Sequence, residues 1–204
     1  MVTDAERAEL EIANGFRQFE LAIDVIRFYL EPERPFSLRP SLILQLQECA
    51  VEGIEFDAGT WRQVPIGISK SRHLPPPAHL VTGLVDEMCG YVNDNWHERS
   101  AFHLSAYIMW RLNWIHPFRD GNGRTSRILS YLALCLRLGY VLPGSPTIPQ
   151  QIQDNRKPYF DALESADDIM AKGRIDLSVM ESMIKGMLAT QLLSVIHSAE
   201  NGKV

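Results

Sequence analysis

Residues 116–139 read His116-Pro-Phe-Arg-Asp-Gly-Asn-Gly-Arg-Thr-Ser-Arg-Ile-Leu-Ser-Tyr-Leu-Ala-Leu-Cys-Leu-Arg-Leu-Gly139, a polar loop followed by an apolar run. The run places apolar residues on nearly every face of a helix, which is typical of a helix buried at the centre of an all-α domain. Gly139 is expected to end this helix. We therefore expect a helical domain built around this segment, with the polar loop at the start of its central helix.

Apolar residues at helical spacing predict further helices on both sides of this segment. The predicted helices cover residues 5–30, 78–96, 98–115 and 155–166, with a shorter helix near 41–53 and a long final helix from about 176. Ser41, Thr147 and Asp176 are the expected starts of three of them. The predicted fold class is mainly α, a helical bundle around a central helix.

One segment breaks this helical pattern. Residues 64–68 read Val-Pro-Ile-Gly-Ile, a short β-prone run, and a polar stretch and three successive prolines at 75–77 follow. Proline cannot continue a central strand because it has no N–H to donate. The sequence therefore predicts a small exposed β-hairpin.

Length and charge limit the classes of function. The chain has 204 residues, a net charge of -5 and a pI near 5.7, so it suits a single domain without a general attraction to nucleic acid or anionic lipid. We expect no nucleic-acid partner and no membrane partner. The three cysteines are odd in number and far apart, which indicates reduced core thiols and a cytoplasmic location.

The glycine-rich loop is an expected anion site. Gly121, Asn122 and Gly123 precede a helix, so that successive backbone N–H groups and the positive end of the helix dipole can face one anion. Arg124 and Arg127 are three residues apart and project from neighbouring positions on one helix face. Two arginines beyond a glycine turn indicate a polyphosphate with more than one phosphate bound.

Two further side chains give this site a chemistry. Asp120 is suited to hold Mg²⁺ that bridges phosphate oxygens. His116, at the head of the loop, can accept a proton as a general base. The residues thus predict a metal-assisted nucleotidyl or phosphoryl transfer to a hydroxyl, and they leave open which phosphorus is attacked.

The run from His116 to Arg127 resembles the signature of the Fic family, His-x-Phe-x-Asp/Glu-Gly-Asn-Gly-Arg-x-x-Arg, at every specified position. The resemblance implies a protein adenylyltransferase that moves AMP from ATP to a Ser, Thr or Tyr hydroxyl of a target protein, with Mg²⁺ as cofactor. It implies one Fic-type domain over 1–204. Its expected parts are a Fic core at about 42–166, a flap near 61–74, and flanking helices within 1–40 and 175–204.

The resemblance also implies roles outside the signature. The segment from Gly59 to His73 is similar to the family's flap, a hairpin that docks the target protein's backbone as an added strand, and the expected docking residues are Val64, Ile66 and Ile68. Asn155 and Tyr159 resemble positions near the family's adenosine pocket.

The family's inhibitory motif, Ser/Thr-x-x-x-Glu-Gly/Asn, has no complete copy in this chain. Glu200-Asn201 has the right ending, but Ile196 stands where Ser or Thr belongs. Glu200 is therefore the candidate inhibitory glutamate for Arg127, and a separate inhibitory partner is the alternative. A methionine stripe on the last helix fits core packing or a homodimer.

Other functions remain open from the sequence. Within the same family, the sequence is also compatible with transfer of UMP, GMP or phosphocholine, and with deAMPylation, the removal of AMP. From a different class, the chain can be a non-catalytic regulatory module that binds ATP and a partner without turnover.

Overall fold

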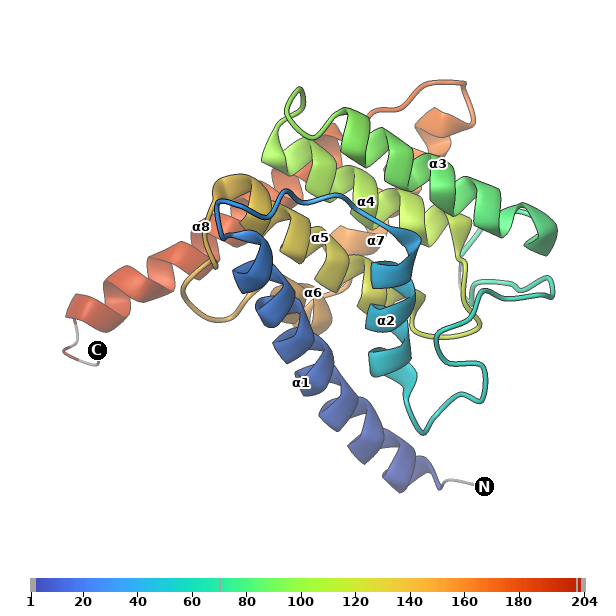
Figure 1. Cartoon of the computed structure of the whole chain (residues 1–204), viewed down its shortest axis with the longest axis horizontal. Coiled ribbons are helices and arrows are strands. Elements are labelled where there is room, and N and C mark those ends of the chain that lie inside the picture. Colours follow the sequence, from blue (N-terminus) through green and yellow to red (C-terminus); the bar gives the residue numbers. More distant parts are fainter. Residues whose placement is uncertain (1–2, 70, 201, 203–204) are drawn as a thin grey trace.

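The computed structural model describes residues 3–69, 71–200 and 202, and these fold into eight α-helices and one short 3-10 helix (Figure 1). The elements are α1 (Asp4–Tyr29), α2 (Pro40–Val51), η1 (Ala78–Leu80), α3 (Val81–Asp94), α4 (Ala101–Ile115), α5 (Asn122–Leu138), α6 (Ile148–Asp154), α7 (Lys157–Met170) and α8 (Ser178–Glu200). The predicted mainly α fold class is confirmed.

The central helix is α5, as the sequence predicts. It packs against α1, α2, α4 and α6, and Leu129, Leu132 and Leu134 on it are fully buried. Burial of one such leucine contributes roughly 1.5–3 kcal/mol, so this helix anchors the core. Gly139 ends it in the left-handed conformation with φ 85° and donates its N–H to the Cys135 carbonyl at 2.9 Å.

α4 and α5 make the most extensive helix-to-helix contact among the described residues, and the motif loop at 116–121 joins them. The hydroxyl oxygens of Ser105 and Ser130 lie 2.7 Å apart in the buried contact between the two helices. Side chains this small let the two backbones approach, and each hydroxyl also lies within hydrogen-bonding distance of the other residue's carbonyl. The loop that joins the two helices is therefore carried on a rigid pair.

α1 lies along α2 and α5 (Figure 1). Its first turn is closed by a capping box between Thr3 and Glu6. Two buried amides hold it to α2: Asn14 donates to the Glu52 carbonyl at 2.8 Å, and Gln18 donates to the Leu46 carbonyl at 2.9 Å. Because buried amides must be hydrogen-bonded, these contacts specify how α1 lies on the core.

Helix starts agree with the sequence in part. Thr147 caps α6, and Asp176 accepts a hydrogen bond from the N–H of Ser178 at 2.9 Å. Ser41 is not a cap, because α2 begins at Pro40, whose fixed φ suits the first helical position.

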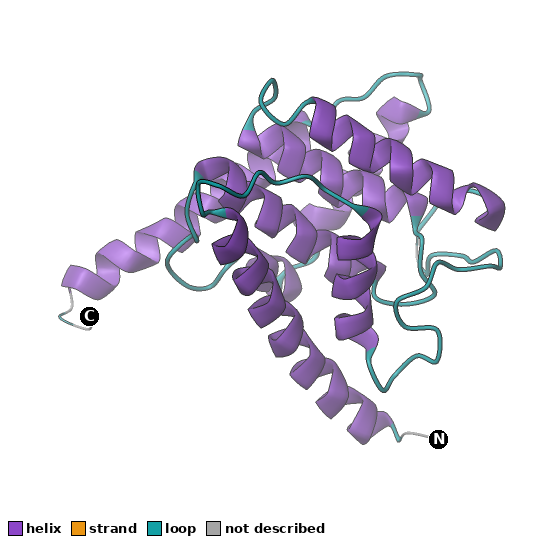
Figure 2. Cartoon of the chain, viewed as in Figure 1, coloured by secondary structure: helices purple, strands orange, loops and turns teal. Residues whose placement is uncertain are grey.

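The predicted β-hairpin is the main correction. Within 61–69 and 71–77, which are the described residues of this region, no residue is assigned to a strand, and Figure 2 shows loop. Pro65 and the prolines at 75–77 lack N–H groups, so these residues cannot build a regular ladder of backbone hydrogen bonds. Lys70 lies outside the described residues.

α8 packs against α4, α6 and α7, and its C-terminal end projects away from the other helices (Figure 1). It is the one helix among the described residues with the length and apolar composition of a membrane span, and 22% of that window is buried. Core helices of soluble proteins have the same composition, so this is weak evidence of a membrane. The buried Gln191 accepts from the N–H of Ile148 at 3.1 Å, which ties α8 to the start of α6.

Candidate active site

His116 is the first residue after α4 and has a left-handed backbone, with φ 50° and ψ 59°. It is the one residue other than glycine with a positive φ among those described. Its N–H still donates to the Leu112 carbonyl at 2.9 Å, so α4 ends at this turn. A bulky residue adopts this conformation at a cost and is often found so at functional sites.

Arg62 holds His116 in this conformation. Its Nε donates to the His116 carbonyl at 2.7 Å, and its backbone N–H donates to the Pro117 carbonyl at 2.9 Å. Nη1 donates to the carbonyl of Val64 at 3.1 Å, within the predicted flap. Arg62 is buried, and burial lowers its pKa. One guanidinium therefore couples the flap segment to the head of the motif loop.

The His116 ring is arranged as a proton acceptor. Nδ1 lies 3.2 Å from the carbonyl of Asn113, so in the neutral ring Nδ1 carries the proton and Nε2 has the lone pair. Burial is the largest cause that lowers the pKa of His116 to about 4; the contact with Asn113 opposes the shift, and the positive charge of Arg62 adds to it. The ring is therefore neutral near pH 7.

Asn122 shapes the loop with its side chain. Its Oδ1 accepts from the N–H of Phe118 at 2.9 Å, and its Nδ2 donates to the Phe118 carbonyl at 2.8 Å. The Phe118 ring is buried and packs against Trp61, with ring centroids 5.0 Å apart. Because the Asn122 amide is used within the loop, a phosphate contact by this residue would come from its backbone.

The two glycines of the loop are required for different reasons. Gly121 has φ 85°, and a Cβ there would lie 3.0 Å from Cγ1 of Val51. Gly123 lies in the first turn of α5, where a Cβ would lie 3.2 Å from Nη1 of Arg127. A side chain at 121 is thus strained by the backbone, and one at 123 would need the Arg127 guanidinium to shift by a few tenths of an ångström.

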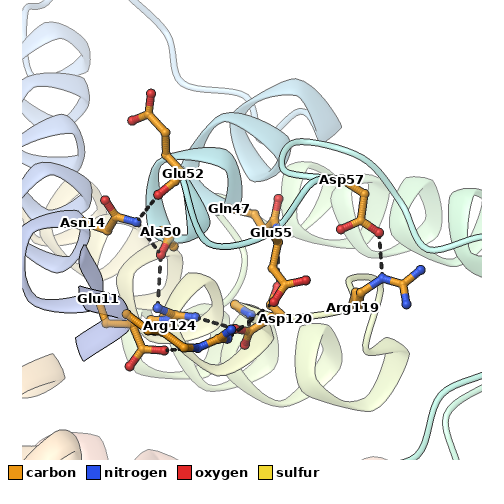
Figure 3. A network of polar contacts seen from close by, with 12 residues as sticks. Glu11, Asn14, Gln47, Ala50, Glu52, Glu55, Asp57, Arg119, Asp120 and Arg124 are labelled. Carbon is orange, nitrogen blue, oxygen red and sulfur yellow. Dashed lines mark hydrogen bonds and ion pairs between the residues drawn. The ribbon is translucent and has the colours of Figure 1, made fainter. Parts of the chain in front are cut away.

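Asp120 lies at the centre of a polar network (Figure 3). Its Oδ1 accepts from the N–H of Gly121 at 2.6 Å, and its Oδ2 accepts from Nη2 of Arg124 at 2.9 Å. The Asp120 carbonyl accepts from Gln47 at 3.0 Å, and Arg124 also donates to the carbonyl of Ala50 at 3.1 Å. These bonds place the predicted metal carboxylate beside the predicted phosphate arginine.

This donor set fits Mg²⁺ held in part by a substrate. The Asp120 side chain is 36% exposed, and no group of three or more His, Cys, Asp or Glu side chains suited to a metal occurs among the described residues. Mg²⁺ is commonly bound by one or two carboxylates together with substrate phosphates. A single carboxylate beside the motif arginine Arg124 suits that mode of binding.

Arg7 of α1 also reaches Asp120, and no sequence signal pointed to it. Its Nη2 lies 3.1 Å from Oδ2 of Asp120 and 3.4 Å from Oε1 of Glu55. Its Nε lies 3.3 Å from Oε1 of Glu11. The first helix, predicted only as a flanking element, therefore contributes a cation to the motif network.

Arg127 has no acidic partner in the described chain. Its Nη2 donates to Oε1 of Gln153 at 3.2 Å, and no described carboxylate lies within 4.0 Å of it. Burial lowers its pKa, and the nearby hydroxyl of Tyr159 partly opposes that shift. A half-buried guanidinium without a counter-charge is suited to an anionic ligand.

Glu200, the candidate inhibitory glutamate, is exposed on the last turn of α8. It forms no ion pair with Arg127 in the described residues, and that end of α8 extends away from the bundle (Figure 1). Asn201, the second residue of the candidate ending, lies outside the described residues.

The two predicted adenosine residues occupy different environments. Asn155 is exposed at the end of α6, where its Oδ1 accepts from the N–H of Lys157 at 3.3 Å. Tyr159 is buried, and its hydroxyl accepts from Nδ2 of Asn113 at 2.7 Å and lies 3.3 Å from Oγ of Ser126. Asn113 thus joins Tyr159 to the His116 ring, a role that the sequence did not indicate.

The flap candidates lie on a loop anchored at both ends. Val64 is 42% exposed, and Ile66 and Ile68 are partly exposed. Arg62 anchors the start of the segment, as described above. At the other end, Nε2 of His73 lies 2.7 Å from the Trp114 carbonyl.

Sequence comparison relates part of this chain to Fic proteins. A sequence model described as Fic/DOC family matches residues 37–134. The chain is 34% identical over 121 residues to the Protein adenylyltransferase Fic of Aedes aegypti, covering 58% of this chain and 21% of that protein. It is 29% identical over 126 residues to a Fido domain-containing protein of Dictyostelium discoideum, covering 61% of this chain and 82% of that protein. The chain thus spans about a fifth of the length of the mosquito relative.

Solved structures show the same fold over most of this chain. A Fic family protein from Desulfovibrio desulfuricans G20 superposes with a TM-score of 0.71 at 23% identity, covering 93% of this chain and 53% of that one. Fic-1 of C. elegans superposes with a TM-score of 0.69 at 19% identity, covering 91% of this chain and 51% of that one. At these identities the likeness shows the fold.

Proposed function

We propose that this chain, which contains a Fic domain, is a Mg²⁺-dependent protein adenylyltransferase that moves AMP from ATP to a Ser, Thr or Tyr hydroxyl of a target protein. The observation that carries the proposal is the His116 ring, neutral with Nε2 as its proton acceptor, on the loop that also bears Asp120 and leads into Arg124 and Arg127. Relatives named protein adenylyltransferase support ATP as the substrate.

In the proposed reaction His116 acts as the general base. Nε2 takes the proton of the target hydroxyl as its oxygen attacks the α-phosphorus of ATP, and the bond from that phosphorus to the pyrophosphate oxygen breaks. AMP is then attached to the target, and pyrophosphate leaves. Neighbouring phosphate anions would raise the His116 pKa from its low value in the free protein and make the ring a stronger base.

The remaining motif residues would bind the polyphosphate. Backbone N–H groups from Gly121 to Gly123 and the guanidiniums of Arg124 and Arg127 would hold phosphate oxygens, and Asp120 would hold Mg²⁺. When bound, that ion neutralises charge that develops on the phosphates. Arg127 is available for this contact because its polar partners in the described chain, the Gln153 amide and the Tyr159 hydroxyl, are neutral groups.

Two outer segments would recognise the nucleoside and the target. Asn155 is proposed at the rim of the adenosine pocket, and the buried Tyr159 would support that pocket from beneath. The segment 61–74 would contact the target protein, with Val64, Ile66 and Ile68 facing it. Their exposure beside the anchored His116 turn supports this role.

The test is transfer of label from α-labelled ATP to proteins of a cell lysate with Mg²⁺. The wild-type chain is expected to label protein and His116→Ala to label none, with Arg27→Ala on the exposed face of α1 as the matched control. An Arg7→Gln variant is assayed in parallel, because Arg7 pairs with the proposed metal carboxylate Asp120 and its removal frees that group. The proposal is wrong if the wild type and Arg7→Gln both transfer nothing. UTP, GTP and CDP-choline in parallel identify a different transferred group, and release of AMP from a modified protein identifies deAMPylation.

ATP binding without any transfer would support the regulatory module instead. A cytoplasmic location, a homodimer and a separate inhibitory partner remain predictions for the same protein.

A further inference from the structure

Arg7 is held between three carboxylates from three parts of the chain. Glu11 lies one turn further along α1, Glu55 lies in the loop after α2, and Asp120 lies in the motif loop. The N–H of Arg7 donates to the Thr3 carbonyl at 2.8 Å, inside the capped first turn of α1. The backbone of Arg7 is therefore fixed by the helix while its guanidinium extends to the motif.

This guanidinium uses the same oxygen that Arg124 uses. Nη2 of Arg7 lies 3.1 Å and Nη2 of Arg124 lies 2.9 Å from Oδ2 of Asp120. The other carboxylate oxygen, Oδ1, accepts the N–H of Gly121. A divalent cation that binds Asp120 through Oδ2 must therefore displace two cations, because like charges repel and an oxygen that faces two guanidiniums has little room for a metal.

The two arginines differ in what they can do after displacement. Arg124 lies at the start of α5, where its guanidinium would bind the proposed polyphosphate after it leaves Asp120. Arg7 lies on a different helix and also pairs with two other carboxylates, Glu11 and Glu55. These ion pairs would keep its guanidinium nearby when a metal ion binds Asp120. Arg7 can therefore leave Asp120 and return without unfolding α1.

We propose that Arg7 is a tethered cation that competes with the divalent metal for Asp120, so that the first turns of α1 set the metal affinity of the site. This inference rests on the proposed function in one respect, the assignment of Asp120 as the metal carboxylate. Any movement of α1 that withdraws Arg7 raises the metal affinity, and metal binding in turn releases the contact between Arg7 and Asp120.

The exposure of the pair makes this competition modest and reversible. The Arg7 and Asp120 side chains are 42% and 36% exposed, and ion pairs with such solvent access are weak. Removing Arg7 is therefore expected to strengthen metal binding by roughly two- to fivefold.

A purely structural role for Arg7 makes a different prediction. In that case the residue only ties α1 to the core, and its loss lowers stability without strengthening metal binding. Arg17 provides the matched control, because it lies on the same helix and pairs with Glu52 at 2.8 Å, away from Asp120.

The experiment is Mn²⁺ binding measured by electron paramagnetic resonance, at a saturating concentration of a non-hydrolysable ATP analogue, on the wild-type chain and on Arg7→Gln, Arg17→Gln and Asp120→Asn. We expect the Kd for Mn²⁺ to fall roughly two- to fivefold in Arg7→Gln and to stay unchanged in Arg17→Gln. The binding that Arg7→Gln strengthens should be lost in the double variant Arg7→Gln, Asp120→Asn.

Equal or weaker Mn²⁺ binding by Arg7→Gln overturns the inference, as does the absence of Asp120-dependent binding in every variant. Thermal unfolding of each variant confirms that it is folded at the temperature used. Because no turnover is measured, a chain that transfers no AMP can still show the Arg7 effect, and an active chain can fail to show it. The two proposals therefore fail separately.

Discussion

The Nε of Arg62 donates to the carbonyl of His116 at 2.7 Å, across 54 residues of sequence. This bond holds the left-handed turn that presents the proposed base, and the same side chain binds the flap carbonyl of Val64. The orientation of His116 and the path of the flap thus depend on one buried guanidinium.

We expect Arg62→Lys to lower the free energy of unfolding by about 2–4 kcal/mol. A single ammonium cannot reproduce the fork that binds several carbonyls, and buried carbonyls without donors are costly. Arg119→Lys is the matched control, because Arg119 forms an exposed ion pair with Asp57 and should change stability by less than about 1 kcal/mol. Urea unfolding measures both, and equal effects would contradict the special role of Arg62.

His116 gives stability a defined pH dependence. Burial lowers its pKa from 6.5 to about 4, so the unfolded chain binds a proton more readily than the folded chain between these values. The free energy of unfolding is therefore unaffected by His116 titration above pH 6.5. It decreases as pH falls from 6.5 towards 4, by at most about 3 kcal/mol.

The control for this dependence is His116→Asn, since asparagine tolerates the left-handed backbone and does not titrate. The difference in unfolding free energy between the two proteins should change across this pH window in favour of the variant as pH falls. A constant difference would show that His116 is not shifted.

Gly121→Ala should destabilise the fold by about 1–3 kcal/mol, because φ is 85° and the new Cβ would meet Val51 at 3.0 Å. Gly90→Ala is the opposite case. Gly90 lies within α3, and a Cβ added there would meet no neighbouring group within 4 Å, so alanine should stabilise that helix by about 0.5–1 kcal/mol. Thermal unfolding distinguishes the two signs.

Asn122→Asp should cost about 1–3 kcal/mol of stability, because the carboxylate cannot donate to the Phe118 carbonyl. Asn93 makes the same pair of bonds to Leu38, at 2.7 Å and 2.9 Å, far along the sequence from the motif. Asn93→Asp should therefore destabilise by a similar amount. Only Asn122→Asp should weaken binding of an ATP analogue at a temperature where both variants are folded.

Arg127→Gln should weaken binding of an ATP analogue by roughly 10- to 100-fold, the loss expected for a charge-assisted contact to phosphate. Glu200→Gln should leave it unchanged, because Glu200 is exposed at the end of α8 and does not pair with Arg127 in the described residues. Calorimetric titration measures both affinities. Tighter binding by Glu200→Gln would identify this residue as the inhibitory glutamate.

The extent of sequence-based prediction differs between elements. The central helix, its end at Gly139 and the start of α6 at Thr147 were predictable, because apolar periodicity and cap residues act within a few positions of one another. The hairpin was wrong because a β-prone run specifies a strand only when a partner strand pairs with it. The described residues of 61–77 offer none.

The order of residues from His116 to Arg127 alone determined the composition of the site: a base, a carboxylate, a glycine turn and two arginines, placed before an apolar helix. Only the tertiary structure decided that Arg62 holds the base and that Arg7 reaches Asp120, across 113 residues. The physical reason is the range of the forces involved. Periodicity and capping act between residues that are close in sequence. The partner of a polar group that is buried, or that pairs with a residue on another segment, depends on how the whole core packs.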